Sequence, residues 1–180
     1  MNEEGEIMDI FLPDRYYKNI YQVDYMKLKE DGIKCLLFDL DNTIVPPNVK
    51  KPDKKVRDLF DNLKELDFKV IIMSNSPRKR LIPFKEELVV DCSASSMKPV
   101  KTKFLKILKE YKFDLSETAI IGDQLMTDVF GGNKVGITTI LVNPISKNDI
   151  TVTKFNRKLE KIIEKKLKKR GLFERGKYYD

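Results

Sequence analysis

Two aspartates close an apolar run in the stretch LLFDLDNTIVPP, residues 36–47. Such runs are typical of strands buried in a core, whereas carboxylates avoid burial. Asp39 and Asp41 are therefore expected where the strand leaves the core and meets solvent or a ligand. Two anions this close repel each other, and a bound Mg2+, which prefers oxygen ligands, would resolve the repulsion. From these residues alone, a solvated acidic turn is the alternative.

Further short runs rich in Val, Ile and Leu follow this one up to residue 142. They read KVIIMSN, ELVVD, TAIIGD and ITTILVN, at residues 69–75, 87–91, 118–123 and 137–143. Between them, apolar residues recur at helical spacing over 53–66 and 100–111. This alternation of strands and helices predicts an α/β fold, a doubly wound Rossmann-like parallel sheet covered on both faces.

The 180 residues are expected to form one domain, with its core at about residues 34–145. Residues 1–33 are interpreted as a loop and a short helix near 24–31. The aromatic stretch FLPDRYYKNIY, residues 11–21, is interpreted as packing against the side of the domain.

Composition excludes several classes of protein. Hydrophobic residues make up 41% and charged residues 35%, as in soluble globular domains. No apolar run approaches the roughly 18 residues that cross a bilayer, and the acidic N-terminus has no secretory h-region. Cys35 and Cys92 are interpreted as free thiols in a reducing cytoplasm. Because the chain has no histidine, acid–base chemistry near neutral pH has to come from other groups, most simply carboxylates.

The formal charge of +7 is concentrated near the C-terminus. Residues 154–170 hold nine Lys or Arg and two Glu, so the rest of the chain is neutral. A basic amphipathic helix is expected over about 152–170, ended by Gly171. Three uses of this helix remain open: contact with an anionic membrane, attraction to RNA, or packing on the chain's own sheet. The apolar stripe consists of Phe155, Leu159, Ile162, Ile163 and Leu167.

Polar residues also follow the other predicted strands. Ligands bind beyond the carboxyl ends of parallel strands, so these side chains are expected to meet the two aspartates at one edge. A strand-terminal Ser74 and a lysine at a helix start, Lys98, both suit a phosphoryl group. A surface lysine and an ordinary helix cap are the alternatives for Lys98 and for the pair Asp123 and Asp128.

Taken in order, four motifs resemble those of the haloacid-dehalogenase (HAD) superfamily of phosphatases. They are DxDxT at residues 39–43, Ser74, Lys98-Pro99, and GDxxxTD at residues 122–128. The longer stretches LPDRYYKNI, GDQLMTDVFGGNKVGITTILVNPI and FNRKLE are similar to the capless subclass IIIA phosphatases of the YqeG type. Those enzymes are akin to the phosphatidylglycerophosphate phosphatases of mitochondria and plastids.

The resemblance implies a Mg2+-dependent phosphatase that works through an aspartyl-phosphate. Asp39 would be the nucleophile, and Asp41 the general acid and base, with a raised pKa. Mg2+ would be held by Asp39, the backbone carbonyl of Asp41, and Asp123. The remaining roles are phosphate binding and support, with Asp128 orienting Lys98 or a water molecule. The phosphate-binding residues would be Thr43, Ser74, Asn75 and Lys98, of which Thr43 also orders the loop after the nucleophile.

The spacing of the motifs leaves no room for a cap domain. Only 35 positions separate Asp39 from Ser74, and 24 separate Ser74 from Lys98. A domain needs at least about 50 residues. The site is therefore expected to be open and to suit a phosphate on a protein, a nucleic-acid end or a lipid head group. A neighbouring subunit acting as a lid is the alternative, and the oligomeric state stays open.

The resemblance further implies that phosphatidylglycerophosphate is hydrolysed to phosphatidylglycerol at the cytoplasmic face of the membrane. A soluble sugar phosphate or a nucleic-acid terminal phosphate remains an alternative substrate. A non-catalytic module that binds RNA or membrane through its basic tail is the alternative outside the enzymes.

Overall fold

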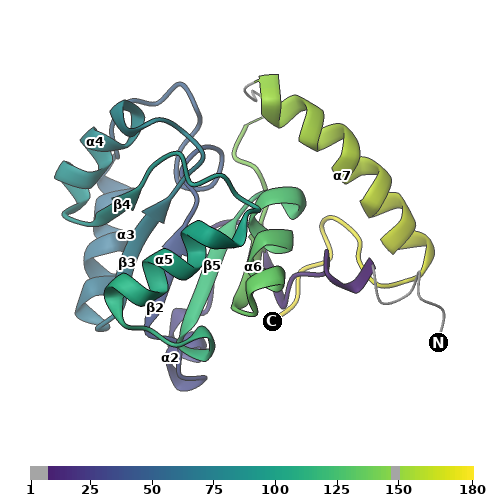
Figure 1. Cartoon of the computed structure of the whole chain (residues 1–180), viewed down its shortest axis with the longest axis horizontal. Helices are drawn as coiled ribbons and strands as arrows, with labels where there is room; N and C mark the ends of the chain where they lie inside the picture. Colours follow the sequence, from purple (N-terminus) through teal and green to yellow (C-terminus); the bar gives the residue numbers. More distant parts are fainter. Residues whose placement is uncertain (1–7, 147–150) are drawn as a thin grey trace.

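A computed structural model describes residues 8–146 and 151–180, with the backbone alone described for residues 151–155. Six parallel strands form one sheet in the order β1-β6-β5-β2-β3-β4. Helices pack on both faces of this sheet (Figure 1). The predicted α/β fold with a parallel sheet is confirmed. The strands are β1 (Arg15–Tyr17), β2 (Cys35–Phe38), β3 (Lys69–Met73), β4 (Asp91–Ser93), β5 (Thr118–Gly122) and β6 (Thr138–Val142).

The helices follow the expected periodicity closely. The patterns over 53–66 and 100–111 form α3 and α5, and α3 buries Val56, Phe60 and Leu63 of its predicted face. Helix α5 buries Phe104 and Leu108, but Leu105, also expected on the buried face, is 48% exposed, and Ile107 is buried instead. The α-helices are α2 (Tyr25–Glu30), α3 (Lys54–Glu65), α4 (Arg78–Leu88), α5 (Lys101–Tyr111), α6 (Phe130–Val135) and α7 (Thr151–Lys169). A short 3-10 turn, η1 (Leu115–Glu117), precedes β5, and a π-helical turn, η2 (Leu125–Val129), follows it.

Successive side chains of the central strands pack into different hydrophobic clusters, because neighbours along a strand point to opposite faces of the sheet. Leu36 and Phe38 of β2 lie in the cluster under α3 and α4. Cys35 and Leu37 lie in the cluster under α5. Burial on both faces explains why these strands read as continuous apolar runs.

Two strand predictions are wrong. Residues 15–17 were expected in a loop, but they form β1, which pairs with β6. The fourth strand was expected at 87–91, but α4 extends to Leu88 and strand β4 begins at Asp91. Val89 takes a left-handed conformation that ends the helix, and Val90 is buried beneath it. The strand was predicted at 87–91 because Val89 and Val90 are β-branched residues, which are common in strands, although here they follow the end of a helix.

The aromatic N-terminal stretch packs on the domain, as predicted, but it does so as the edge strand β1 of the sheet. Tyr16 is fully buried, and its backbone exchanges two hydrogen bonds with Tyr179 near the C-terminus (N–O distances of 2.6 and 2.9 Å). The end of the chain therefore returns to the open edge of β1 and covers it.

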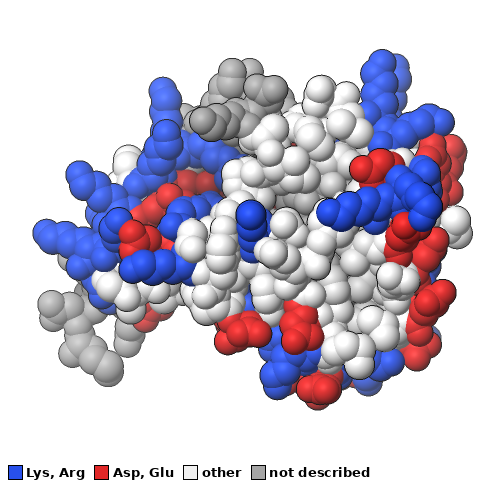
Figure 2. Space-filling model, turned by 180° about the vertical axis from the view of Figure 1, so that it is seen from behind, with Lys and Arg blue, Asp and Glu red and all other residues white. Residues whose placement is uncertain are grey.

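Helix α7 lies at one side of the molecule, beside the turn η2 (Figure 1). Leu167 of the predicted stripe is fully buried against Leu125 and Val129, whereas Ile162 is 56% exposed. The stripe thus packs on the chain's own domain only in part, and Phe155 lies outside the described side chains. Figure 2 shows Lys and Arg side chains projecting around this end of the molecule. Among the described residues, no helix has the length and apolarity needed to cross a membrane.

Candidate active site

The carboxyl ends of neighbouring strands bring the first two aspartates together. Asp39 directly follows β2, and Asp123 directly follows β5. The two strands pair in register, with Phe38 opposite Ile121, and the Asp39 N–H donates to the Ile121 carbonyl (2.9 Å). Residues 84 positions apart in sequence are therefore fixed side by side by the sheet itself.

Three carboxylates form the centre of the site, which we call the acidic cluster: Asp39, Asp123 and Asp128. Each contributes an oxygen within 4.8 Å of the other two, and all three residues are buried. Asp128 comes from the π-helical turn η2, a distortion that is frequent at functional sites. Gly122 makes room for it, because a Cβ at that position would lie 2.1 Å from the Asp128 Cγ.

Lys98 neutralises part of this cluster. Its ammonium donates to Asp39 Oδ1 (2.8 Å) and to Asp128 Oδ1 (2.6 Å), and its side chain is only 1% exposed. The Asn75 side chain fixes the loop that carries this lysine, since it bonds both the N–H and the carbonyl of Lys98. Asn75, which was predicted to bind phosphate, therefore has its side chain on the backbone of Lys98.

Thr43 and Ser74 are also buried at this edge. The Thr43 hydroxyl lies 3.1 Å from Asp123 Oδ1 and 3.4 Å from Asp39 Oδ2, so it sits between two acids of the cluster. The Ser74 hydroxyl accepts a hydrogen bond from the N–H of Ser76 (3.1 Å). Ser74 directly follows β3 and Thr43 lies in the loop after β2, so both hydroxyls lie near the edge of the sheet where a phosphate site was predicted.

Asp41 differs from the other acids, because its carboxylate does not belong to the acidic cluster. It accepts hydrogen bonds from the Ser76 hydroxyl (2.6 Å) and from the Arg80 guanidinium (2.8 and 3.1 Å). The sequence gave no sign of these partners, since Arg80 is one of three cations in PRKR. The Asp41 carboxylate is therefore bound by Ser76 and Arg80, and the metal contact of its backbone carbonyl stays a prediction.

The acidic cluster carries more buried negative charge than Lys98 offsets. Burial raises the pKa of the Asp39 carboxyl to about 8; Lys98 opposes this rise, and Asp128 and Asp123 add to it. Burial also raises the pKa of Asp123 to about 6, against the effect of Arg157. Burial would lower the pKa of Lys98, but Asp128 and Asp39 outweigh it and raise that pKa above the usual range.

This imbalance fits a divalent cation. Buried carboxylate oxygens are ligands that Mg2+ accepts, and added positive charge would keep Asp39 ionised near neutral pH. An ionised carboxylate beside an ammonium and a hydroxyl can attack a phosphorus atom and bind its oxygens. The chemistry that the arrangement supports is therefore phosphoryl transfer to Asp39.

Sequence reasoning missed one residue of the site, Arg157. It reaches Asp123 from helix α7 and forms an ion pair with the Asp123 carboxylate. The stretch FNRKLE, which carried part of the resemblance, contains this arginine. Nothing in the stretch distinguishes it from the other eight basic residues of the tail.

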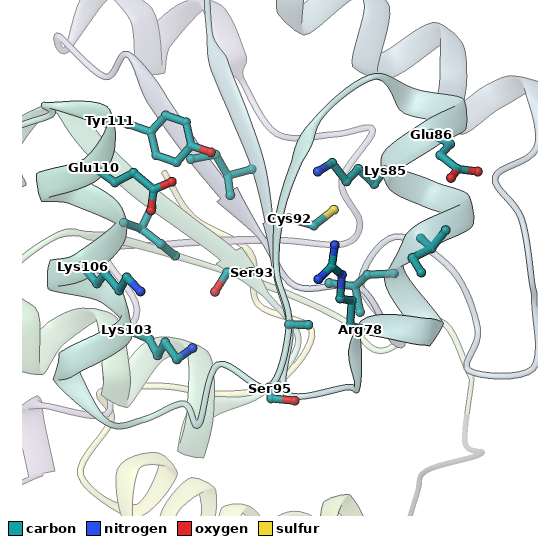
Figure 3. A pocket seen from close by; sticks show the side chains of 15 residues that line it. Arg78, Lys85, Glu86, Cys92, Ser93, Ser95, Lys103, Lys106, Glu110 and Tyr111 are labelled. Atoms are coloured by element: carbon teal, nitrogen blue, oxygen red, sulfur yellow. The ribbon is translucent and has the colours of Figure 1, made fainter.

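A groove of about 630 Å3 lies apart from this site, between α4 and α5 and beside the edge strand β4 (Figure 3). Basic side chains face it from both helices, namely Arg78, Lys85, Lys103 and Lys106. None of the predicted site residues lines it. A second hollow, of about 580 Å3, adjoins the loop after Asp39 and includes Ile44, Pro46 and Ile145.

Comparisons with known proteins agree with this geometry. The family described as mitochondrial PGP phosphatase matches residues 7–81, and the family described as HAD-hydrolase-like matches residues 96–159. The chain is 37% identical over 161 residues to a Bacillus subtilis protein named "Probable phosphatase YqeG", covering 89% of this chain and 94% of that protein. It is 24% identical over 171 residues to an Arabidopsis thaliana phosphatidylglycerophosphate phosphatase, covering 89% of this chain and 49% of that enzyme.

A solved structure shares the fold. It is a 3-deoxy-D-manno-octulosonate 8-phosphate phosphatase from Moraxella catarrhalis, in complex with magnesium, phosphate and a sugar acid. The TM-score is 0.51 at 18% identity, and the match covers 69% of this chain and 77% of that one. Between β2 and β3 this chain has only α3, and between β3 and α5 it has only α4 and β4, so no inserted domain covers the acidic cluster.

Proposed function

Because the chain belongs to the YqeG family of HAD-superfamily phosphatases, we propose that it hydrolyses a phosphate monoester on a phospholipid head group, with Mg2+ as its cofactor. That it is a phosphatase acting on a phosphorylated substrate follows from the family. The lipid substrate, the cation and the residue roles are the proposal. One observation carries the assignment of the residue roles: Lys98 binds two carboxylates of a buried cluster at the carboxyl edge of the sheet.

In the first half of the reaction, an Asp39 carboxylate oxygen attacks the phosphorus atom. The bond between phosphorus and the leaving oxygen breaks, and an aspartyl-phosphate forms. Lys98 and the hydroxyls of Thr43 and Ser74 bind the phosphoryl oxygens. Asp41, entering this step as the carboxylic acid, gives its proton to the leaving oxygen. For this, Asp41 has to exchange its contact with Arg80 for the substrate.

In the second half, the Asp41 carboxylate removes a proton from a water molecule. The water oxygen attacks phosphorus, the bond to Asp39 breaks, and inorganic phosphate leaves with Asp39 and Asp41 restored. Asp128 keeps the Lys98 ammonium directed at the phosphoryl group, since the two form a short ion pair (2.6 Å).

Asp39, Asp123 and the backbone carbonyl of Asp41 would hold Mg2+, which supplies positive charge against the carboxylates and the charge developing on phosphorus. The buried oxygens of the acidic cluster support this assignment. The solved relative that contains magnesium and phosphate supports it through the shared fold.

Three features favour a lipid-borne phosphate. The family of mitochondrial PGP phosphatases matches the first part of the chain. The apolar hollow beside the nucleophile loop offers a surface for the glycerol and acyl part of a lipid, and Ile145 there is 47% exposed. Its N–H donates to the carbonyl of Asn42 (3.0 Å), which ties this surface to the site. The basic side chains of α7 would add attraction to an anionic membrane.

A substrate comparison tests the proposal. Phosphatidylglycerophosphate in mixed micelles would be assayed beside sugar phosphates and nucleotide 3′- and 5′-phosphates, with Mg2+ and with EDTA. We expect the highest kcat/KM for the lipid and no turnover in EDTA. The variant Ile145→Ser should lower kcat/KM for the lipid several-fold and leave a soluble aryl phosphate unaffected, because only the lipid contacts the apolar hollow.

A soluble phosphate hydrolysed at least about tenfold more efficiently than the lipid would refute the lipid assignment. Full activity in EDTA would refute the proposal that the enzyme needs Mg2+. Neither result would alter the membership of the phosphatase family.

A further inference from the structure

Arg157 contacts the acidic cluster from helix α7, outside the sheet. Its Nη2 donates to Asp123 Oδ2, and its Nη1 donates to the Asp123 backbone carbonyl (3.0 Å). Asp123 is fully buried, and the arginine side chain is 16% exposed. A planar guanidinium with two donors on one residue fixes both the position and the rotation of that carboxylate.

The two oxygens of Asp123 have different neighbours. Oδ1 accepts from the Thr43 hydroxyl, which also lies 3.4 Å from Asp39 Oδ2. Oδ1 therefore faces Asp39, and Oδ2 faces Arg157. A cation shared by Asp39 and Asp123 would bind Oδ1 of Asp123 and leave the contact between Oδ2 and Arg157 in place. In this arrangement the guanidinium would lie behind the ligand and would not compete with the cation for it.

The position of Arg157 depends on the docking of α7. Glu160, one turn further along the helix, is 2% exposed and accepts from the Met126 N–H (3.0 Å) and from Arg157 Nη1 (2.9 Å). Leu167, towards the other end of the helix, is buried in the same apolar cluster as Leu125 and Val129. Met126, Leu125 and Val129 all belong to η2, the turn that also carries Asp128. The helix and the acidic cluster therefore share one structural support.

We propose that Arg157 is a positioning residue for Asp123, so that docking of α7 and binding of the cation stabilise each other. The inference rests on the proposed cation site. Outer contacts of this kind orient metal ligands, and their removal costs tenfold to a hundredfold in metal affinity. Coupling between two events is reciprocal, so the cation must also hold the helix more firmly in place.

Titration of the whole metal-free protein with Mg2+ by isothermal calorimetry tests the first half of the inference. Arg157→Gln should weaken the Mg2+ affinity at least about tenfold. Arg157→Lys, which keeps the charge but loses the fork, should fall between Gln and wild type. Lys158→Gln makes the same charge change at the next position, which is exposed, and should stay within about twofold of wild type.

Hydrogen exchange of the α7 amides tests the second half. Mg2+ should slow exchange over residues 157–169 in the wild type and have little effect on it in Arg157→Gln. Leu167→Ala loosens the far end of the helix without contacting the acidic cluster. It should weaken the Mg2+ affinity as well, because Arg157 moves with the helix.

An Arg157→Gln variant that binds Mg2+ as tightly as wild type, or more tightly, would overturn the proposal. A tighter affinity would mean that the guanidinium competes with the cation. Should Arg157→Gln unfold α7, judged by circular dichroism, Arg157→Lys decides: an affinity equal to wild type overturns the proposal, and a reduced one supports it. Asp123→Asn separates the two claims, since unchanged Mg2+ binding in that variant refutes the cation site itself.

Discussion

Lys98 and Arg157 both place a cation on the acidic cluster, but different parts of the fold hold them there. Lys98 comes from a loop bonded to the ends of β3 and β4, and its side chain is 1% exposed between two carboxylates. Arg157 comes from a helix at the side of the molecule and is 16% exposed. The position of Lys98 therefore depends on the sheet, whereas the position of Arg157 depends on the packing of helix α7.

The largest expected effect tests whether the acidic cluster is the reaction centre to which both cations belong. Asp39→Asn should lower kcat for an aryl phosphate at least about a thousandfold, because the amide is not a nucleophile. Thermal unfolding should show an intact fold, since Asn has nearly the same shape. Asp31→Asn, on the surface, serves as the matched control. Activity at the wild-type level in Asp39→Asn would show that the acidic cluster is not the reaction centre.

Removal of the Lys98 ammonium should lower activity more than removal of the Arg157 guanidinium. Lys98→Met leaves two buried carboxylates without their ammonium, so we expect kcat to fall about a hundredfold and the unfolding free energy to fall as well. Raising the Mg2+ concentration should restore most activity to Arg157→Gln and none to Lys98→Met. Lys101→Met, on the exposed start of α5, is the control. Equal rescue of both variants by Mg2+ would show that Lys98 and Arg157 have the same function in the site.

Much of the fold follows from local sequence. Runs of Val, Ile and Leu marked β2, β3, β5 and β6, since strands buried on both faces have no polar alternation. Strand β1 could not be found this way, because its three residues read RYY and its pairing comes from β6, far along the chain. Strand β4 was misplaced because Val89 and Val90 have strand propensity but end a helix.

The site divides in the same way. Asp39 and Asp123 could be placed together because the carboxyl ends of parallel strands converge. Lys98 and Asp128 lie beyond the strand ends, and it was the resemblance to the HAD motifs that assigned them to the site. The partners of Asp41 and Asn75 could not be predicted, since both residue types bond to many groups and only the packed structure selects one. Arg157 could not be predicted either, because nine basic residues share its segment and tertiary docking alone selects it.

Stability against pH sharpens the difference between the two cations. In the metal-free protein the folded state keeps the Asp39 proton up to about pH 8, whereas the unfolded chain loses it near 3.8. The folded state binds more protons across this window, so the unfolding free energy falls as pH rises from about 4 to about 8. We expect Tm in EDTA to drop by about 5 °C or more between pH 5 and pH 8.

Asp39→Asn should remove most of that drop, and saturating Mg2+ should flatten it by favouring the ionised carboxylate. Arg157→Gln should keep a profile at least as steep as wild type, because the guanidinium contacts Asp123 and not Asp39. Scanning calorimetry over this pH range provides the measurement. A wild-type profile that is flat in EDTA would contradict the charge imbalance assigned to the acidic cluster.

The smallest effect on catalysis is expected on the outer face of α7, where the proposed contact with an anionic membrane would lie. Lys158, Lys161 and Lys165 are exposed there, near the exposed Ile162. Each lysine near an anionic membrane contributes about 1 kcal/mol of attraction. Changing all three to Gln should weaken co-sedimentation with phosphatidylglycerol vesicles at least about fivefold at low salt and leave aryl phosphate hydrolysis unchanged. The same change at Lys79, Lys101 and Lys109, exposed on α4 and α5, provides the control. If both triple variants lose vesicle binding equally, attraction follows net charge alone, and α7 then serves the site only through Arg157.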